Sequence, residues 1–153
     1  MAVDVVLCRD RIILWGMAVA GRSVLENSST VLNLNIIASG FTNADRNMLR
    51  RSWKHEACGT IQFAEINADK LDGFRSTAYL ESKLFYAPYF WADLFRDLDR
   101  CIYIDTDVIV EKELAVVAVM DLQGHGLAAA LDPRTLIAPE NPELCLRLGL
   151  RNE

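Results

Sequence analysis

The sequence predicts an open α/β fold, with a mostly parallel sheet and helices on both of its faces. Short apolar runs rich in β-branched residues alternate with segments whose apolar residues recur at helical spacing. Parallel strands need crossover connections, which helices usually supply. The length of 153 residues is about that of one domain, and a hydrophobic content of 52% is enough for a core. We therefore expect residues 1–153 to belong to a single domain.

The first three strands are predicted at residues 3–7, 31–38 and 60–66. VDVVL and VLNLNIIA are short apolar runs, and TIQFAEI alternates between apolar and polar residues as a half-buried strand does. The segment NADKLDGF that follows the third strand predicts a loop, with a turn at Asp72 and Gly73.

Three helical segments are predicted in the same part of the chain. Apolar residues recur at helical spacing from about residue 13 to residue 26. Thr42 or Asn43 is a suitable N-cap for a helix that continues to about residue 54. A further helical region is expected at 77–98, kinked or divided at Pro88 because proline lacks a backbone donor.

The last strands predict an acidic edge on the sheet. CIYI (101–104) and LAAAL (127–131) have the character of buried strands, and a short helix is expected near 112–120. Sheets of this kind bind ligands at the carboxyl ends of their strands. Four carboxylates are expected at that edge, from Asp10, Asp105, Asp107 and Asp132.

The stretch CIYIDTDVIV (101–110) places two aspartates inside an apolar run. Burial of an unpaired carboxylate is costly, so the pair needs a cation, hydrogen-bond donors or the open end of a sheet. Side chains at i and i+2 of a strand share one side, and if the chain turns at that point, Asp105 and Asp107 can converge on one cation. Magnesium and manganese prefer oxygen ligands and leave positions that phosphate oxygens can fill. The pair therefore predicts group transfer from a phosphate-activated donor.

Composition excludes several other classes of function. The net charge of −5 with scattered basic residues argues against a nucleic-acid partner. The longest mainly apolar stretch, residues 12–21, is too short to cross a bilayer, and no targeting signal predicts a compartment. Four cysteines without a C-x-x-C spacing are expected as reduced, mostly buried thiols: Cys8, Cys58, Cys101 and Cys145.

The chain resembles glycosyltransferase family 8, the retaining, nucleotide-sugar-dependent enzymes that include glycogenin and bacterial galactosyltransferases. The resemblance is most specific in DLDRCIYIDTDVIV (97–110) and SKLFYAPYF (82–90), and it extends to DVVLCRD, GMAVAGRSVLENSS and LAAALDP. It implies a GT-A-like nucleotide-diphospho-sugar-binding fold. It also implies transfer of a hexose or pentose from a UDP-sugar to a hydroxyl-bearing glycan, protein or lipid, assisted by Mn²⁺ (or Mg²⁺).

The resemblance also implies roles for individual residues. Asp105 and Asp107 match the family's metal ligands, and Asp105 is also placed to approach the donor's ribose or sugar. Asp10 matches an acidic residue near the nucleotide base, and Lys83 matches a basic residue that helps to bind the sugar-phosphate portion. Asp132 matches an aspartate near the sugar hydroxyls. From the residues alone, Lys83 fits an exposed helix lysine equally well, and Asp132 fits a turn before a proline.

The sequence also departs from the family pattern. Arg11, Ile12 and Ile13 stand where the family commonly has a polar residue and an aromatic beside the base. The chain stops before the family's F-N-A/S-G-V segment and its His-x-x-Gly-x-x-Lys motif, whose histidine completes the metal site; His55 and His125 are expected at the surface and do not replace it. We therefore expect the donor-binding, C-terminally truncated portion of a glycosyltransferase domain, with weakened metal affinity, low or absent turnover and self-association through the surface that truncation exposes.

Two rival functions remain open at this point. In haloacid-dehalogenase-like phosphatases an apolar strand also runs into D-x-D, and Asp105 would then be the nucleophile and Asp107 the general acid/base. That motif normally follows the first strand of its domain, whereas about a hundred residues precede it here. The second rival is a non-catalytic module that binds a nucleotide or a protein, with the acidic edge as a remnant.

Overall fold

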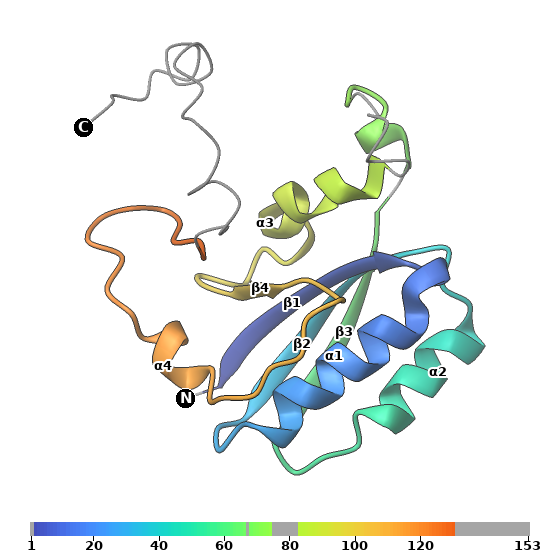
Figure 1. The fold of residues 1–153 in the computed structure, drawn as a ribbon. Coiled ribbons are helices and arrows are strands. Elements are labelled where there is room, and N and C mark those ends of the chain that lie inside the picture. The colour runs from blue at the N-terminus through green and yellow to red at the C-terminus, as the bar shows by residue number, and fades with distance from the viewer. Residues whose placement is uncertain (1, 67, 75–82, 131–153) are drawn as a thin grey trace, which may run out of the picture. The chain divides into compact units, whose positions relative to one another are not determined.

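The computed structural model describes residues 2–66, 68–74 and 83–130, which fall into two units, Met1–Met120 and Asp121–Glu153. Within the described residues, the first unit holds a sheet of four strands in the order β3-β2-β1-β4 (Figure 1). All neighbouring strands are parallel, which confirms the predicted α/β class. The strands are β1 (Val3–Asp10), β2 (Leu32–Ser39), β3 (Cys58–Glu65) and β4 (Ile102–Ile104).

Helices α1 (Leu14–Glu26) and α2 (Asn43–Ser52) cover one face of the sheet (Figure 1). The turn η1 (Arg11–Ile13) leads into α1, and Thr42 caps α2 through a capping box with Asp45, as its N-cap position predicted. Alternate residues of β1, such as Val5 and Leu7, contribute to the apolar core on this side.

Trp53 joins the two helices in this core. Its indole is fully buried and its Nε1 donates a hydrogen bond of 3.0 Å to the backbone oxygen of Ala18. A Cβ on Gly21 would lie 2.6 Å from the indole, so only glycine lets α1 approach the ring this closely. Trp15, by contrast, lies on the outer side of α1 and is exposed.

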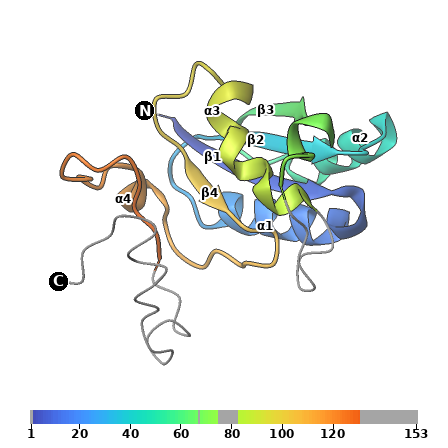
Figure 2. The same cartoon turned by 90° about the horizontal axis from the view of Figure 1, so that it is seen from above.

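A second layer covers the opposite face (Figure 2). It consists of η2 (Ala68–Leu71), the 3-10 segment η3 (Lys83–Phe90) and the single turn α3 (Trp91–Leu94). The other alternate residues of β1, Val6 and Cys8, pack here against Leu84 and Ala87. Both faces of the sheet are thus covered, as predicted.

The helical region expected at 77–98 differs from the prediction. Residues 75–82 lie outside the described residues, and from Lys83 to Phe90 the chain is a 3-10 helix rather than an α-helix. Pro88 lies inside it, and a proline removes one backbone donor of the α-helical ladder. Over 83–98, the part of this region that the structure describes, only Trp91–Leu94 is α-helical, so this layer is irregular there.

The strand predicted at 127–131 is absent over residues 127–130, the part that the structure describes. These residues are exposed and pair with no strand of the described residues. A strand needs a neighbour for its backbone groups, and alanine has little intrinsic preference for the extended state. Asp132 lies outside the described residues. The predicted helix near 112–120 is the single turn α4 (Ala115–Ala118).

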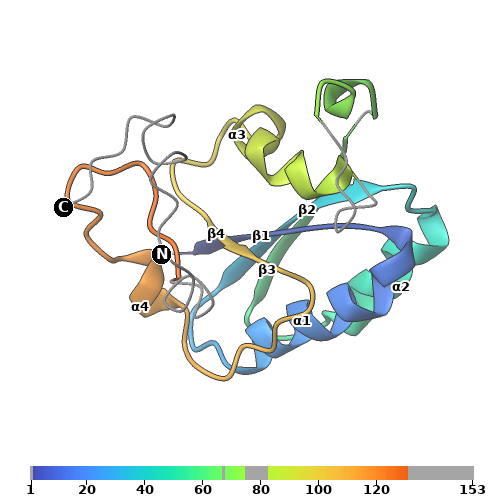
Figure 3. The ribbon, with the colours of Figure 1, turned by 45° about the horizontal axis from the view of Figure 1, so that its top comes forward.

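The segment after β4 runs back along α1 (Figure 3). The backbone N–H of Val110 donates to Ser23 Oγ at 3.0 Å, and Asn27 Nδ2 donates to the Val110 oxygen at 2.9 Å. Further on, the Glu113 carboxylate accepts two hydrogen bonds from Ser29, each 2.6 Å long. These contacts fix the chain that leaves the acidic pair. Among the described residues, no helix has the length and apolar character needed to span a membrane.

Candidate functional site

The pairing of β1 with β4 brings the predicted acidic residues together. Leu7 lies opposite Ile104 in a parallel register, Asp10 is the last residue of β1, and Asp105 directly follows β4. Asp107 lies in the turn that comes next. Since the carboxyl ends of parallel strands meet at one edge of a sheet, these three carboxylates share that edge. Asp132 is outside the described residues.

Asp105 and Asp107 are free of cationic partners within the described residues. Asp105 is half-buried and its Oδ1 accepts a hydrogen bond of 2.9 Å from the backbone N–H of Thr106, and Asp107 is exposed. Neither takes part in a salt bridge with another described residue. The same part of the chain contains no group of three His, Cys, Asp or Glu side chains that could hold a metal ion. The pair can therefore supply two carboxylate ligands and no complete protein cage.

Thr106, between the two aspartates, is held from two sides. Only 2% of it is exposed, and its Oγ1 accepts a hydrogen bond of 3.0 Å from Arg9 Nε. On the other side, a Cβ built on Gly16 would lie 2.9 Å from the Thr106 carbonyl oxygen, so α1 approaches this turn closely. The buried threonine thus anchors the turn that carries both aspartates.

Tyr103 and Cys8 are neutral at physiological pH. Burial raises the pKa of Tyr103, and the Asp105 carboxylate adds to that rise. Burial also raises the pKa of Cys8 to about 12, against the opposing charge of Arg9. The phenol near Asp105 is therefore a hydrogen-bond donor rather than a third anion, and the Cys8 thiol is no nucleophile. Cys58 and Cys101 are also free thiols, as expected, but they are half-buried rather than buried, and Cys145 lies outside the described residues.

Arg9 is a site residue that the sequence interpretation missed. Its guanidinium carbon lies 5.0 Å from the ring centroid of Phe85, which is 41% exposed. With the bond to Thr106, the side chain connects β1, η3 and the turn after β4. The sequence offered one signal for Arg9, which is that it directly precedes Asp10 at the end of a strand.

The other predicted residues have local partners. Asp10 Oδ1 caps η1 by accepting a hydrogen bond of 3.1 Å from the Ile12 N–H. The next residue, Arg11, pairs with Asp45 at 2.7 Å, and Ile12 is 88% exposed. Lys83 Nζ lies 3.3 Å from both the backbone oxygen and Oδ1 of Asp72.

Within the part of the chain that the structure describes, His55 contacts none of the three aspartates of the acidic edge. His55 is half-buried before β3, where its Nδ1 accepts a hydrogen bond from the Ala57 N–H and its Nε2 lies 3.8 Å from Glu26. His55 was expected as a solvated surface residue, and its side chain is instead partly covered. His125 is exposed, as expected, and belongs to the second unit.

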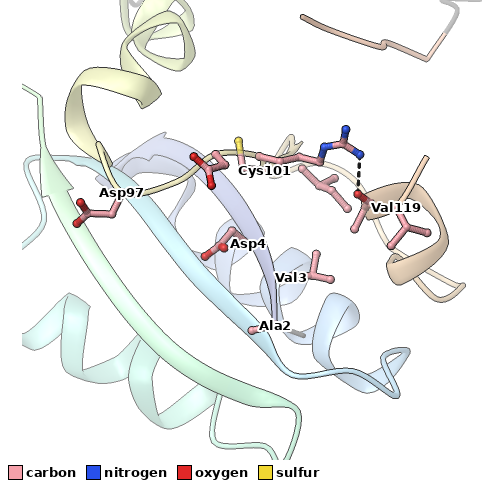
Figure 4. Close-up of a pocket in the computed structure, with 10 residues that line it drawn as sticks. Ala2, Val3, Asp4, Asp97, Cys101 and Val119 are labelled. Atoms are coloured by element: carbon pink, nitrogen blue, oxygen red, sulfur yellow. Dashed lines mark hydrogen bonds between the residues drawn. The ribbon is translucent and has the colours of Figure 1, made fainter. Parts of the chain in front are cut away.

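A cavity of about 450 Å³ lies at the opposite end of the sheet (Figure 4). Ala2, Val3 and Asp4 line it at the start of β1, and Asp97 and Cys101 line it ahead of β4. These are the amino ends of the two strands, whereas ligands of open parallel sheets bind at the carboxyl ends. The cavity is therefore separate from the acidic edge.

A parallel sheet covered on both faces, with an acidic pair closing the strand beside β1, defines the nucleotide-diphospho-sugar-binding fold of the GT-A type. The chain belongs to glycosyltransferase family 8, whose family model matches residues 4–145. The fold assignment is supported by a crystal structure of the galactosyltransferase LgtC in complex with donor and acceptor sugar analogs. It superposes with a TM-score of 0.83 at 23% identity and covers 97% of this chain and 52% of LgtC.

Two relatives come from Streptococcus pneumoniae. Glycosyltransferase GlyF is 28% identical over 138 residues, which cover 86% of this chain and 32% of GlyF. The apo form of glycosyltransferase GlyE superposes with a TM-score of 0.64 at 19% identity, covering 88% of this chain and 30% of GlyE. The chain thus spans about half or less of the length of the relatives named here.

Proposed function

We propose that residues 1–153 form the donor-binding portion of a single glycosyltransferase domain. The domain would transfer a hexose or pentose from a UDP-sugar to a hydroxyl-bearing acceptor, with retention of anomeric configuration. The observation that carries the proposal is the meeting of Asp10, Asp105 and Asp107 at one sheet edge, where the last two have no cationic partner among the described residues. Family membership and the sugar analogs bound to LgtC support a sugar donor and a sugar acceptor.

Asp105 and Asp107 fit a hard divalent cation, Mn²⁺ or Mg²⁺. Their oxygens are the ligand type that these ions prefer, and one or two carboxylates together with substrate phosphates and water make a usual ligand set. Asp105 is half-buried and Asp107 is exposed, so neither carboxylate is closed off from a ligand by the described residues. When bound, the ion would stabilise the negative charge that develops on the departing diphosphate.

The remaining residues would position the donor. Asp10 ends β1 beside the acidic pair and would lie near the nucleotide base. The neutral Tyr103 phenol can donate a hydrogen bond near Asp105. The Lys83–Asp72 ion pair is exposed, and such pairs contribute little stability, so Lys83 could exchange Asp72 for a donor phosphate at low cost. Asp132 would lie near the sugar hydroxyls, as its match to the family's aspartate implies.

Of the rival functions, the phosphatase is less well supported. Family membership favours sugar transfer, and the acidic pair follows β4, an edge strand of the described sheet, rather than the first strand of the domain. A binding-only relative would use the same acidic edge to hold a nucleotide, so measurements of donor binding and of hydrolysis are both needed.

The test is ligand-observed NMR with a panel of UDP-hexoses and UDP-pentoses, together with phosphate release from p-nitrophenyl phosphate in Mg²⁺. We expect UDP-sugar binding that requires Mn²⁺ or Mg²⁺, is lost in Asp105→Asn and is kept in Asp99→Asn, an exposed aspartate at the far end of the sheet. Phosphate release that disappears in Asp105→Asn, without UDP-sugar binding, would replace this proposal with the phosphatase.

A further inference from the structure

We propose that Arg9 binds the diphosphate of the nucleotide-sugar donor, a role that rests on the donor-binding function above. Arg9 precedes Asp10 at the carboxyl end of β1, the strand that pairs with β4. Its Nε lies 3.0 Å from the hydroxyl oxygen of Thr106, the residue between the two candidate metal ligands. A phosphate bound to a metal on those ligands would therefore lie near this guanidinium.

Two contacts hold the Arg9 side chain in place. Nε donates to Thr106 Oγ1, and the guanidinium lies over the Phe85 ring of η3, 5.0 Å from its centroid. The hydrogen bond fixes one side of the planar group and the ring supports its face. A side chain held in this way loses less conformational entropy when it binds an anion.

The other side of the guanidinium is free to bind a ligand. Its two terminal nitrogens make no hydrogen bond and no ion pair with any described residue, and they are not among the buried polar atoms that lack a partner. They therefore reach solvent. Two coplanar N–H donors match two oxygens of a phosphate, which a lysine cannot match in the same geometry.

The balance of charge also favours a cation here. Asp10, Asp105 and Asp107 bring three carboxylates to one edge, and a nucleoside diphosphate adds negative charge that one divalent ion cannot offset alone. Arg9 would thus reduce the repulsion between the acidic edge and the donor.

The test is calorimetric titration of UDP in the presence of Mn²⁺. Arg9→Gln keeps the aliphatic stem and an amide that can donate to Thr106, and we expect it to weaken UDP binding by about 10- to 100-fold, the effect of losing hydrogen bonds to a charged group. Arg46→Gln is the matched control, because Arg46 also pairs with an aromatic ring, 5.5 Å from the Phe63 centroid, but on α2. Arg9→Lys keeps the positive charge but lacks the two coplanar N–H donors of the guanidinium, so its affinity for UDP should lie between those of wild type and Arg9→Gln. If Arg9→Gln does not fold, Arg9→Lys is compared with wild type instead.

A second measurement separates phosphate binding from mere support of the turn. Mn²⁺ binding in the absence of nucleotide, followed by electron paramagnetic resonance, should be unchanged or stronger in Arg9→Gln, because a nearby positive charge has been removed. Equal loss of Mn²⁺ and UDP binding would overturn the proposal, and so would a UDP affinity within about twofold of wild type. A wild-type chain that binds no UDP would overturn the donor-binding function itself.

Discussion

Arg9 Nε and Thr106 Oγ1 form a hydrogen bond of 3.0 Å that ties the carboxyl end of β1 to the turn after β4. Thr106 is almost fully buried and Arg9 is half-buried, so this contact is partly buried, while the aspartates on either side of Thr106 are more exposed than it is. The turn is thus held by its central residue, while Asp105 is half-buried and Asp107 is exposed.

Removal of the Thr106 hydroxyl should destabilise the protein. Thr106→Val keeps the shape of the side chain but leaves the Arg9 Nε–H without its acceptor, which should cost about 1–2 kcal/mol of unfolding free energy. Thr106→Ser keeps the acceptor and is the control for the role of the hydroxyl. Urea denaturation measures both variants, and a Val variant as stable as wild type would show that the bond contributes nothing.

Gly16 should not tolerate a methyl group. Alanine in a helix interior normally gains about 1 kcal/mol over glycine, but a Cβ here would lie 2.9 Å from the Thr106 carbonyl oxygen, a backbone atom that cannot rotate away. Overpacking costs about 1–3 kcal/mol, so we expect Gly16→Ala to be less stable than wild type. Gly73→Ala, with nothing within 4 Å of its added Cβ, should change stability little. Thermal unfolding compares the two variants, and a stabilised Gly16→Ala would contradict the close approach.

Asp45 should make stability depend on pH in the acid range. Hydrogen bonds from Thr42 and Arg11 lower its pKa from 3.8 to about 2. The unfolded state therefore takes up the proton first as the pH falls. The contribution of Asp45 is complete above pH 3.8 and is lost as the pH falls toward 2. Asp45→Ala should be less stable than wild type at neutral pH, and the difference should shrink through this window.

Urea midpoints measured across that pH range test this linkage. Asp93→Ala, an exposed aspartate on α3, is the control for a general effect of net charge. A constant difference between wild type and Asp45→Ala at every pH would contradict a role for the ionised carboxylate.

The apolar surface after β4 should promote self-association. Val116 and Val119, three residues apart at α4, are each more than half exposed, and clustered exposed apolar side chains commonly mark interaction surfaces. Val116→Glu with Val119→Glu should lower the apparent mass at a given protein concentration. Val19→Glu, an exposed valine on α1, should not. Sedimentation velocity distinguishes these outcomes, and a wild-type chain that is monomeric at all concentrations would contradict the prediction.

The sequence predicted those parts of the fold whose pattern is local. Strands β1, β2 and β3 have continuous or alternating apolar residues. Thr42 is an N-cap residue, and Asp45, three residues later, forms the capping box with it. The strand predicted from the run LAAAL was wrong over residues 127–130, because apolar character alone does not provide a partner strand. Pro88 predicted a kink or division of a helix, but the 3-10 segment Lys83–Phe90 runs through it.

The candidate site was predicted in part for a similar reason. The Asp-x-Asp interrupts an apolar strand, so Asp105 and Asp107 could be recognised from neighbouring residues alone. Arg9 owes its position to Phe85 and Thr106, which are distant in sequence and come together only through the β1–β4 pairing and the η3 layer. Contacts of this kind are set by tertiary structure and leave no periodic pattern.

The most direct test of the metal-assisted donor site is calorimetric titration of UDP with and without Mn²⁺, on wild type and Asp107→Ala. We predict that UDP binding depends on Mn²⁺ and that Asp107→Ala weakens it by at least about 10-fold, since even an outer-shell partner of a metal ligand contributes that much. Asp99→Ala, at the far end of the sheet, should bind as wild type does. UDP binding that is equal with and without Mn²⁺, or unchanged in Asp107→Ala, would contradict the account.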